Sequence, residues 1–555
     1  MRESALAGIF IAAIVASPNY LFSQPANSVS DGDEIIVVMD EESPATETTL
    51  AVESPATPSL MALEIPYTPP ETAEPTSDAT AFLFSGDIST NFAGDVLWDD
   101  RPENVIDWQN KAKIALSGKP SEESKVFVEG RFFHRALAER EMEDCLFVLQ
   151  SGEGCRNEYE VTPGEIYYDY YFSIFDIRLG NQVFKWTSLD GQGVLDVLNP
   201  RDFRYSPFDS DNKMPVLAAR LNGYLGDLTA SLVYIPFFSP HKFRLFGDDF
   251  SLLQDDVPSP LPLEIEELKS LFHPSVMDKF QETLATELPD ESLDNSSFAV
   301  RLQYPIFNLE LSAVYYYGFE RTPRLLMDDS VRNALAAFKD ARELSGGGFA
   351  PIGLGELIEE QNQLADALRT INQKLIRGEE VIRAYHPRTQ LAGLGLFYIY
   401  ESFTFKAEGA FIPRMTLYYS DYTPLYQTVV QSGGEITYEY GEPLSVTVGS
   451  LQSFLPERPA KEILLFEERD MNVGLYGNVK SQFLRTTLEL SATAIYNLWL
   501  NDVVAKGYIQ YKATDRHIVK AGVMFFYGPD PSEKLTPGGA FDKNDFVFGE
   551  YRYVF

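Results

Sequence analysis

The sequence predicts an all-β chain, a transmembrane antiparallel β-barrel of about 18 strands (16–18), because three patterns agree. First, side chains alternate between apolar and polar along segments of about ten to fourteen residues, which indicates a sheet with one apolar and one wet face. Second, short turns and long loops alternate between these segments, as they do in barrels that cross a membrane. Third, the final segment alternates up to an aromatic residue, Phe555.

Residues 1–23 have the pattern of a secretory signal peptide. An apolar run from Ala5 to Ala16 is followed by polar residues and an expected cleavage site near Ser23. This predicts export from the cytoplasm. Cys145 and Cys155 would then lie in an oxidising compartment, and we expect them to form a structural disulfide.

Residues 24–80 are expected to be a disordered periplasmic arm. The segment holds twelve acidic residues, eight prolines and no Lys or Arg, and such a composition buries too little apolar surface to offset its chain entropy. A solvated tether is the simpler interpretation, and an arm that captures a periplasmic protein partner is the alternative.

Residues 81–555 are predicted to form the barrel. In residues 484–498, Leu488, Leu490 and Ala492 share one face, while Glu489 and Ser491 share the other. The eighteen predicted strands are 82–92, 106–118, 123–138, 164–175, 176–187, 214–225, 227–237, 296–306, 307–319, 389–401, 402–415, 427–440, 443–454, 467–480, 483–498, 502–514, 516–528 and 544–555.

The connections distinguish a membrane barrel from a soluble sandwich, which has no reason to place all of its long loops at one end. The predicted long, extracellular loops are 139–163, 188–213, 238–295, 320–388 and 529–543. The strands also have the length of a tilted bilayer crossing, at least about nine to eleven residues. We therefore expect a closed barrel, since an open sheet edge cannot face lipid.

The ends of the strands are rich in aromatic residues, which are favoured at a bilayer interface. The clusters Tyr167–Tyr171, Tyr315–Tyr317 and Tyr418–Tyr419 are predicted to be mostly girdle residues. Phe555 resembles the terminal signal by which the barrel-assembly machinery recognises its substrates.

The inward face is predicted to be net basic, although the chain carries 45 Lys+Arg against 82 Asp+Glu, a net charge of −37. The inward acids expected are Glu129, Asp169, Glu408, Glu489 and Glu550. The predicted pore-lining basic residues are Lys111, Lys113, Arg131, Arg135, Arg178, Arg220, Arg301, Lys406, Arg414, Lys480, Arg485, Lys506, Lys512, Lys520 and Arg552. Two interpretations stay open: anion selectivity, or a structural network of ion pairs in the lumen.

Two of the long loops are predicted to contain helices. One helix is expected near 263–287, one beginning at Asp328-Asp329-Ser330, and one from about 355 to 377 with Leu364, Leu368, Ile371 and Leu375 on one stripe. We expect these helices to cap or partly plug the barrel, and binding of a partner by the stripe is the alternative.

Residues 178–204 read RLGNQVFKWTSLDGQGVLDVLNPRDFR. This stretch resembles part of a family of porin-like Gram-negative outer-membrane barrels, mostly of unknown substrate, and is more loosely similar to alginate-export-type barrels. In that family the strand continues into a loop that bends into the lumen, so the resemblance implies a channel. It implies that Gln182 and Trp186 close the strand, and that a polar constriction loop is built by Asp190, Asp196, Asn199, Arg201, Asp202 and Arg204. The alternative is that these residues form turns and satisfy the loop backbone.

Other classes of function are disfavoured. The acidic composition argues against a nucleic-acid partner. None of the common catalytic or nucleotide-binding motifs is present, so we expect no enzyme, no cofactor and no metal site.

The sequence therefore predicts a channel in the outer membrane of a Gram-negative bacterium, surrounded by outer-membrane lipids. It would carry polar solutes, with anions or an exopolysaccharide as narrower options. The alternative is a plugged barrel that binds or anchors a partner through its arm or helical loops.

Overall fold

The computed structural model describes residues 82–96, 105–135, 159–190, 193–203, 212–242, 286–334, 354–419, 423–441, 443–463, 466, 469–529, 536–542 and 544–555. The predicted signal peptide, the acidic arm, Cys145, Cys155 and Arg204 lie outside the described residues.

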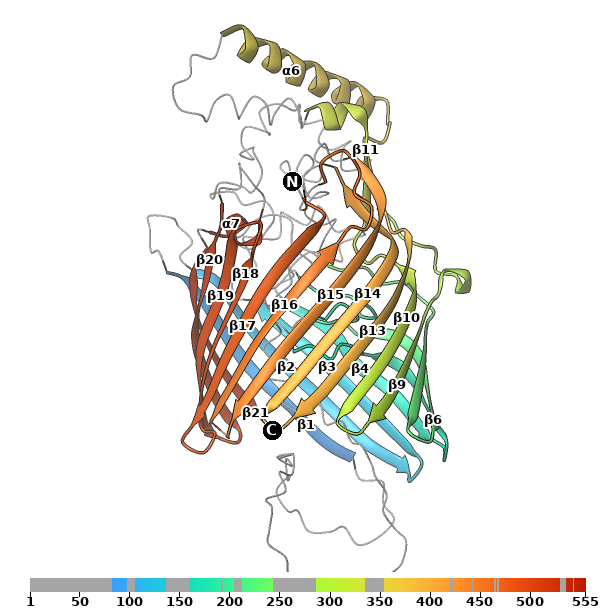
Figure 1. Cartoon of the computed structure of the whole chain (residues 1–555), viewed down its shortest axis with the longest axis vertical. Helices are drawn as coiled ribbons and strands as arrows, with labels where there is room; N and C mark the ends of the chain where they lie inside the picture. Colours follow the sequence, from blue (N-terminus) through green and yellow to red (C-terminus); the bar gives the residue numbers. More distant parts are fainter. Residues whose placement is uncertain are drawn as a thin grey trace, which may run out of the picture.

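Eighteen strands form one closed antiparallel barrel (Figure 1). Each strand pairs with the next barrel strand along the chain, and β1 also pairs with β21, which closes the sheet. The prediction of about 18 strands is confirmed. The barrel strands are β1 (Phe82–Asp95), β2 (Val105–Ser121), β3 (Ser124–Arg135), β4 (Tyr159–Tyr171), β5 (Phe175–Gln182), β6 (Val216–Leu225), β7 (Leu228–Ile235), β9 (Ser297–Ile306), β10 (Leu309–Phe319), β13 (Arg388–Tyr400), β14 (Phe403–Tyr418), β15 (Pro424–Tyr440), β16 (Leu444–Phe454), β17 (Met471–Phe483), β18 (Leu488–Asn497), β19 (Asp502–Thr514), β20 (His517–Tyr527) and β21 (Phe546–Val554).

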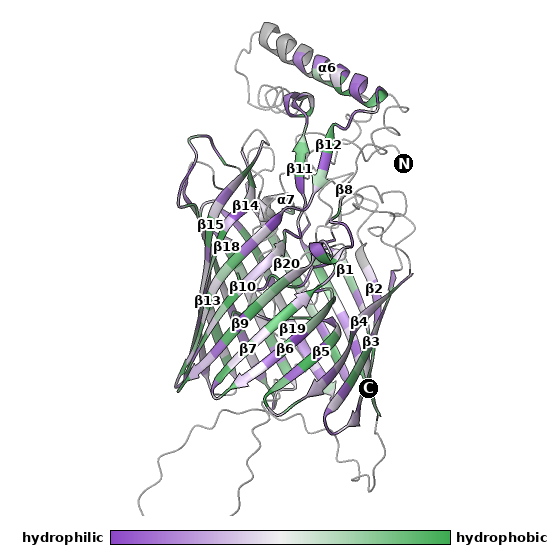
Figure 2. Cartoon of the chain, turned by 90° about the vertical axis from the view of Figure 1, so that its right-hand side faces the viewer, coloured by the Kyte–Doolittle hydropathy of each residue, from purple (hydrophilic) through white to green (hydrophobic). Residues whose placement is uncertain are grey.

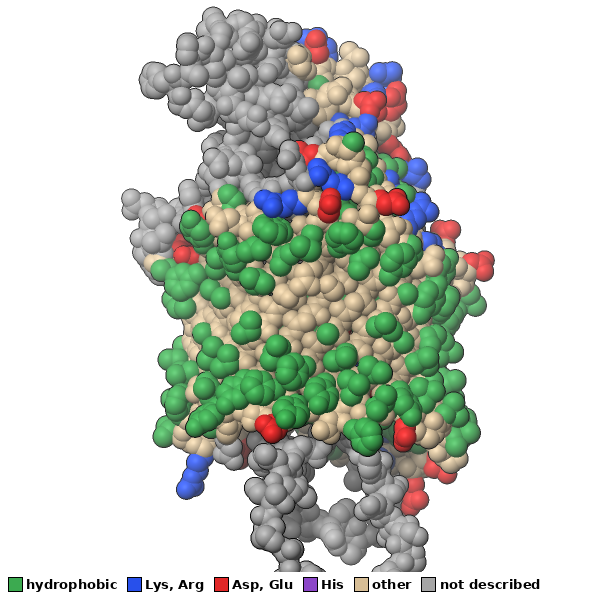
Figure 3. All heavy atoms as spheres, viewed as in Figure 1, with side chains coloured by type: hydrophobic (Ala, Val, Ile, Leu, Met, Phe, Trp, Pro, Cys, Tyr) green, Lys and Arg blue, Asp and Glu red, His purple; other side chains and the backbone are tan. Residues whose placement is uncertain are grey.

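The outer surface of the barrel is apolar because the strands alternate. Leu394 is 68% exposed and Val448 is 62% exposed. Ile436 is 48% exposed, whereas Glu435 and Thr437 beside it are inward, polar and at most 7% exposed. Figure 3 shows these apolar side chains as a band around the barrel. A closed sheet with an apolar outer band is the architecture of an outer-membrane β-barrel, and the chain belongs in that membrane.

The predicted aromatic girdle is only partly correct, since alternation divides each tyrosine cluster between the two faces. Tyr168 and Tyr315 are exposed on the outer surface. Tyr167 and Tyr316 are buried, at most 9% exposed, on the opposite side of their strands. Tyr418 is also buried, where its hydroxyl accepts the Leu325 N–H at 2.8 Å.

The seam of the barrel lies between β1 and β21. Phe555 exchanges two backbone hydrogen bonds with Gly86, at 2.9 and 3.0 Å, and its ring lies 5.5 Å from that of Phe84. Phe555 therefore extends the pairing of β21 with β1 by one residue.

A small second sheet stands above the long-loop end of the barrel (Figure 2). It contains β8 (Thr286–Glu287), β11 (Arg324–Met327) and β12 (Ile382–Tyr385), with β12 parallel to β8 and antiparallel to β11. Helix α6 (Leu354–Ile376) lies beyond this sheet (Figure 1), and a short helix, α7 (Pro537–Ala540), packs on β19 and β20.

The loop helices are only partly as predicted. The helix at 329 begins where expected, and the Asp328 carboxylate accepts the Ser330 N–H at 2.9 Å in its first turn. Lys374 of α6 forms an ion pair with Asp328 at 2.7 Å. The buried stripe of α6 includes Leu368, Ile371 and Leu375, as predicted. The predicted helix 263–287 is wrong at its end, where residues 286–287 form β8, and its remainder lies outside the described residues. No helix in the described residues is both long enough and apolar enough to cross a membrane.

Candidate functional site

The segment between β5 and β6, residues 183–203, folds into the barrel and packs along one side of its wall. Phe184, Trp186, Leu195 and Leu198 are at most 6% exposed and form a core cluster with inward side chains of the wall. The wall residues of this cluster come from β6, β7, β9, β10, β13 and β14: Val216, Ala218, Val233, Ile235, Ala299, Val314, Tyr316, Leu391, Ala410 and Ile412. We call residues 183–203 the inward segment.

Two glycines in the wall make room for the inward segment. A Cβ placed on Gly393 of β13 would lie 2.2 Å from Leu195 Cδ2, and one on Gly433 of β15 would lie 2.7 Å from Leu189 Cδ1. The described contacts of the segment with the wall therefore run from β6 round to β15.

The tip of the inward segment is held by two carboxylates of the wall. Glu408 of β14 accepts the backbone N–H groups of Ser188 and Leu195, the second at 3.3 Å, and the Ser188 hydroxyl at 3.1 Å. Glu435 of β15 accepts the Asp190 N–H at 2.9 Å. Because buried backbone donors need acceptors, these two side chains fix the position of the tip.

A third contact joins the same strands. Lys406 of β14 forms ion pairs with the Asp190 carboxylate and with Glu435, the latter at 2.8 Å. The Tyr476 hydroxyl donates to Glu435. Sequence reasoning missed Glu435, although it alternates with Ile436 on the predicted strand 427–440 and was therefore detectable as inward.

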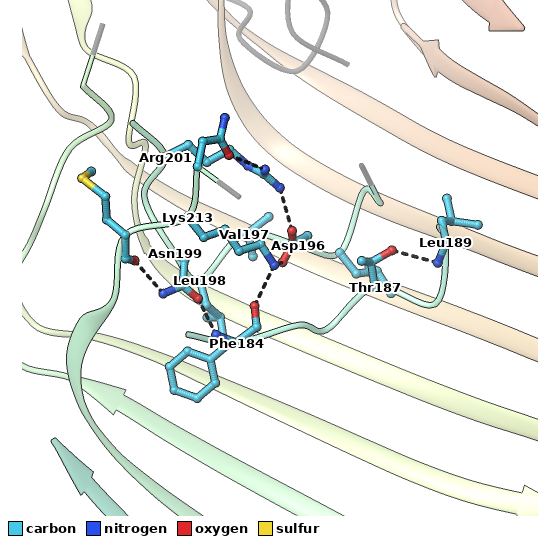
Figure 4. A network of polar contacts seen from close by, with 12 residues as sticks. Phe184, Thr187, Leu189, Asp196, Val197, Leu198, Asn199, Arg201 and Lys213 are labelled. Carbon is cyan, nitrogen blue, oxygen red and sulfur yellow. Dashed lines mark hydrogen bonds and ion pairs between the residues drawn. The ribbon is translucent and has the colours of Figure 1, made fainter. Parts of the chain in front are cut away.

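The base of the inward segment is organised by Asn199 and Asp196 (Figure 4). The Asn199 amide nitrogen donates to the carbonyls of Gln182 and Met214 at 3.0 and 2.9 Å, and its oxygen accepts the Phe184 N–H at 2.6 Å. Gln182, the last residue of β5, therefore lies where the strand was predicted to close.

Asp196 forms two ion pairs at the base of the segment. Its carboxylate lies 2.8 Å from Arg201 and 2.9 Å from Lys213 (Figure 4). Burial lowers the pKa of Lys213, and Asp196 opposes that shift. The backbones of Asp202 and Lys242 form an isolated parallel β-bridge. Trp186 belongs to the core cluster and lies outside the strand.

The structure thus brings five of the six proposed constriction residues into one segment. Asp190 lies at the tip, and Asp196, Asn199, Arg201 and Asp202 lie at the base. Most of their polar atoms contact the chain itself. The described contacts of the base residues therefore lie within the chain, and the role of the segment in the pore stays a prediction.

An arginine beyond β10 clamps the segment from above. The Arg321 guanidinium donates to the carbonyls of Val197 at 3.5 Å, Leu198, and Ser239 at 2.5 Å. His241 Nδ1 accepts the Arg201 N–H at 2.8 Å. Burial lowers the pKa of His241 well below its ordinary value, and the positive charge of Arg321 adds to the effect.

The acid next to this clamp, Glu320, is partly buried. Glu320 accepts the backbone N–H of Thr416 at 3.0 Å, and burial raises its pKa to about 7. The Glu320 carbonyl lies 2.8 Å from His386 Nδ1, and burial lowers the pKa of His386 to about 4.

Thirteen of the fifteen residues predicted to line the pore lie on the inward strand face, as the exposed apolar residues on the same strands show. Many of these bases pair with acids. Glu129 lies 2.7 Å from Arg131 and 3.5 Å from Lys113, and Glu550 lies 3.7 Å from Lys520 and 3.6 Å from Arg552.

The paired bases on the other strands behave similarly. Arg178 makes two hydrogen bonds to Asp169 at 2.6 and 2.8 Å, and Arg220 lies 3.6 Å from Asp176. Other bases lie over aromatic rings: Lys111 over Phe133 at 5.9 Å and Lys506 over Phe548 at 5.4 Å. The remaining inward positions are those of Arg135, Arg301 and Lys512.

Two predicted pore-lining residues are wrong. Arg485 lies in the turn between β17 and β18 with φ 56°, and not on a strand. Arg414 lies at an irregularity in β14 between Ile412 and Met415, and its guanidinium is 3.7 Å from the ring of Tyr426. Tyr426 shares the face of Ile436, which points away from the lumen.

No protein-family model matches the chain, and no curated protein matches it. Solved structures match at low similarity. Pseudomonas aeruginosa OccK8 (OprE) has a TM-score of 0.45 at 10% identity, covering 85% of this chain and 98% of that chain. Acinetobacter baumannii OccAB3 has a TM-score of 0.44 at 10% identity, covering 85% and 99%. Salmonella typhi OmpF has a TM-score of 0.37 at 10% identity, covering 85% and 97%.

The chain is therefore similar to these barrels at a level that assigns no family. The barrel fold is shown by the closed strand pairing of the chain itself. In the described residues there is no group of three or more His, Cys, Asp or Glu side chains arranged to hold a metal ion.

Proposed function

We propose that the protein is an outer-membrane diffusion channel for small polar solutes, with a preference for anions. The observation that carries this proposal is the unequal use of the lumen. The inward segment packs on the β6–β15 side, so the solute path would run along the polar inward residues of β16–β21 and β1–β3.

In two charged groups on that side the acid lies deeper than the bases, which favours anions, whereas Glu550 at 20% exposed lies level with Lys520 at 17% and Arg552 at 20%. The Glu129 side chain is 5% exposed, whereas Lys113 is 40% and Arg131 16% exposed. Glu489 is likewise 5% exposed beneath Lys480 at 28%. A permeating ion would meet the cationic ends first, and charges in a narrow lumen are weakly screened.

The ratio of bases to acids in two of these groups also favours anions. Glu129 and Glu550 each contact two bases. Asp87 lies opposite Lys113 in the pairing of β1 with β2 and offsets part of the basic charge of the Glu129 group. The pairing also means that the selectivity should be moderate, since at least half of the basic charge in these groups is offset.

The inward segment argues for small solutes over an exopolysaccharide. Its tip is tied to β14 and β15, far around the sheet from β5 and β6, where the segment leaves and rejoins the barrel. A segment held at both its base and its tip narrows the path that a polymer chain would need.

Planar-bilayer recording of the purified protein tests the proposal. We expect stable single-channel conductance, and in a KCl gradient a reversal potential of the sign given by chloride preference. The double variant Lys113→Gln/Arg131→Gln should move the permeability ratio toward cations. Arg369→Gln is the matched control, because Arg369 is 69% exposed on α6, outside the barrel.

Two outcomes would refute the proposal. Preference for cations in the wild type would contradict the anionic path. Absence of conductance, both in the wild type and in Glu408→Ala, whose tip is released, would favour a plugged barrel that binds a partner.

A further inference from the structure

Two arginines of the barrel wall face the lumen beside the inward segment. Arg220 lies on β6 and Arg301 on β9, and their neighbours Leu221 and Leu302 are 40% and 42% exposed on the outer surface. Because side chains alternate along a strand, both arginines lie on the inward face. Their side chains are only partly buried.

The strand pairing places these arginines on either side of β7. Arg220 lies opposite Val233, and Arg301 lies opposite Ser231. Val233 and Ser231 are successive inward residues of β7. The two arginines are therefore two strands apart and offset by one inward position along the strand direction.

Both arginines lie where the apolar contact with the inward segment ends. Ala218 and Ala299, the inward residues that precede them, belong to the core cluster, as does Val233. From these alanines, β6 and β9 run toward the short turns, which are periplasmic in such barrels. Further toward the short turns, the core cluster includes no residue of β6, β7 or β9. Arg220 and Arg301 thus border the cluster on its periplasmic side.

The guanidinium of Arg301 has donors without acceptors. Its Nε is buried with no hydrogen-bond partner, and within the described residues the group forms no hydrogen bond and no ion pair. The acids whose charges act on Arg301 are Glu310 and Glu408. Glu310 accepts a hydrogen bond from Gln303 at 2.8 Å, and Glu408 holds the tip of the inward segment. Leaving a charged donor buried without an acceptor is costly, so this arrangement calls for a ligand.

Arg220 is bound only loosely. Its Nη2 lies 3.6 Å from the Asp176 carboxylate, beyond hydrogen-bond distance, and its Nε is also buried without a partner in the described residues. Asp176 instead accepts hydrogen bonds from Asn222, at 3.2 Å, and from the Tyr224 hydroxyl. The side chain of Arg220 is 23% exposed, so its donors can be reached from the lumen.

The charges around the two arginines almost cancel. Asp176 lies near Arg220, and the charge of Glu310 acts on the other arginine. Arg178, which lies opposite Arg220 on β5, is paired with Asp169. A nearly neutral site accepts a singly charged group more readily than a doubly charged one.

We propose that Arg301, assisted by Arg220, binds the carboxylate of a small organic solute on the periplasmic side of the inward segment. A guanidinium presents parallel N–H donors that fit the two oxygens of a carboxylate. This inference rests on the channel function proposed above, and it names monocarboxylates as the solute class.

Saturation-transfer NMR of the detergent-solubilised full chain tests the binding without requiring conduction. Propionate is the probe, and propionamide, which has a similar shape and no charge, is the comparison. We expect saturable binding of propionate alone. Arg301→Gln should raise the half-saturating concentration by about tenfold, and Arg220→Gln should raise it less, because Asp176 already offsets part of the charge of Arg220.

Arg369→Gln, on α6 outside the barrel, is the matched control and should bind propionate like the wild type. Arg301→Lys keeps the charge and loses the planar fork, so it should bind with intermediate affinity. Heat-modifiable mobility on gels confirms that each variant still forms a barrel.

Three results would overturn the inference: unchanged binding in Arg301→Gln, equal binding of propionate and propionamide, or an equal loss in Arg369→Gln. Inorganic phosphate is the last arm. If it displaces propionate at a concentration below the half-saturating concentration of propionate, the site recognises phosphate and the carboxylate class is wrong.

The conductance measurement separates this inference from the proposed channel. Anion-selective conductance without propionate binding would contradict the inference and leave the channel in place. Propionate binding that depends on Arg301, without any conductance, would support the site and contradict the channel.

Discussion

Asp190 and Lys406 form an ion pair between the inward segment and the barrel wall although they lie 216 residues apart in the sequence. The pair joins the tip of the inward segment to β14, and the Lys406 side chain is only 9% exposed. The position of the tip therefore depends on a contact between two chain segments that are remote in sequence.

A double-mutant cycle on this pair should reveal coupling. Asp190→Asn and Lys406→Met should each destabilise the tip, and the double variant should cost less than the sum, by about 0.5–3 kcal/mol. Hydrogen exchange of the amides of residues 188–190 measures the free energy of opening. Strict additivity would show that the pair does not hold the tip.

Replacing Glu408 should release the tip more completely. Glu408→Ala leaves the N–H groups of Ser188 and Leu195 without their acceptor, which costs about 1–3 kcal/mol for each unpaired donor. We expect a larger and noisier single-channel conductance. Glu408→Gln keeps an acceptor oxygen and should have a smaller effect.

The matched control for Glu408 is Glu310→Gln. Glu310 accepts a hydrogen bond from Gln303 at 2.8 Å on the neighbouring strand and does not contact the inward segment in the described structure. An equal change in conductance in this variant would mean that any inward carboxylate sets the conductance.

Leu195 should anchor the middle of the inward segment. It is fully buried in the core cluster, so Leu195→Ala should cost about 2–5 kcal/mol. Faster hydrogen exchange throughout residues 193–203 is the expected result. Leu293→Ala, at a residue that is 68% exposed, should leave that exchange unchanged.

Arg321 should position the same segment from above. Arg321→Met removes the donor to three carbonyls while keeping an apolar stem, so residues 197–199 should exchange faster and the conductance should fluctuate more. Arg321→Lys should restore part of the protection. If the methionine variant matches the wild type in both measurements, the clamp is incidental.

Glu320 makes the stability of the rim depend on pH. Its pKa is about 7 in the folded chain, against about 4.3 for an ordinary glutamate, so the folded state holds a proton that the unfolded state has lost between these values. The contribution of Glu320 to local stability should be largest below about pH 4.3. It should fall by up to roughly 3 kcal/mol as the pH rises to 7.

The variant Glu320→Gln removes that titration. Exchange of the amides of residues 320–327 should therefore be slower in the variant than in the wild type at pH 8, and similar in the two at pH 5. A difference that does not grow with pH would show that the carboxyl is not protonated in the fold.

The alternation of side chains was sufficient to find the barrel strands, but it does not detect every interruption. Leu484, Arg485 and Thr486 continue the apolar–polar pattern, yet all three have positive φ, from 53° to 65°, and form a turn. None is a glycine, so no turn signal was present. The irregularity at Arg414 reverses the expected face for a similar reason.

The position of the inward segment was predictable only in part. Turn-forming residues and the resemblance in residues 178–204 indicated a loop that enters the lumen. Which wall receives its tip depends on Glu408, Glu435 and two wall glycines more than 190 residues away, and no local pattern specifies such contacts.

The seam between β1 and β21 has a kinetic consequence. Every other neighbouring pair of barrel strands joins segments that are consecutive along the chain, whereas the seam joins the first barrel strand to the last. Loop-closure entropy makes that pairing the slowest to form. Until it forms, the sheet has two unpaired edges, so insertion must protect both edges from aggregation and from lipid. A small change at Gly86 would then act chiefly on the yield of closed barrels and only weakly on the finished pore.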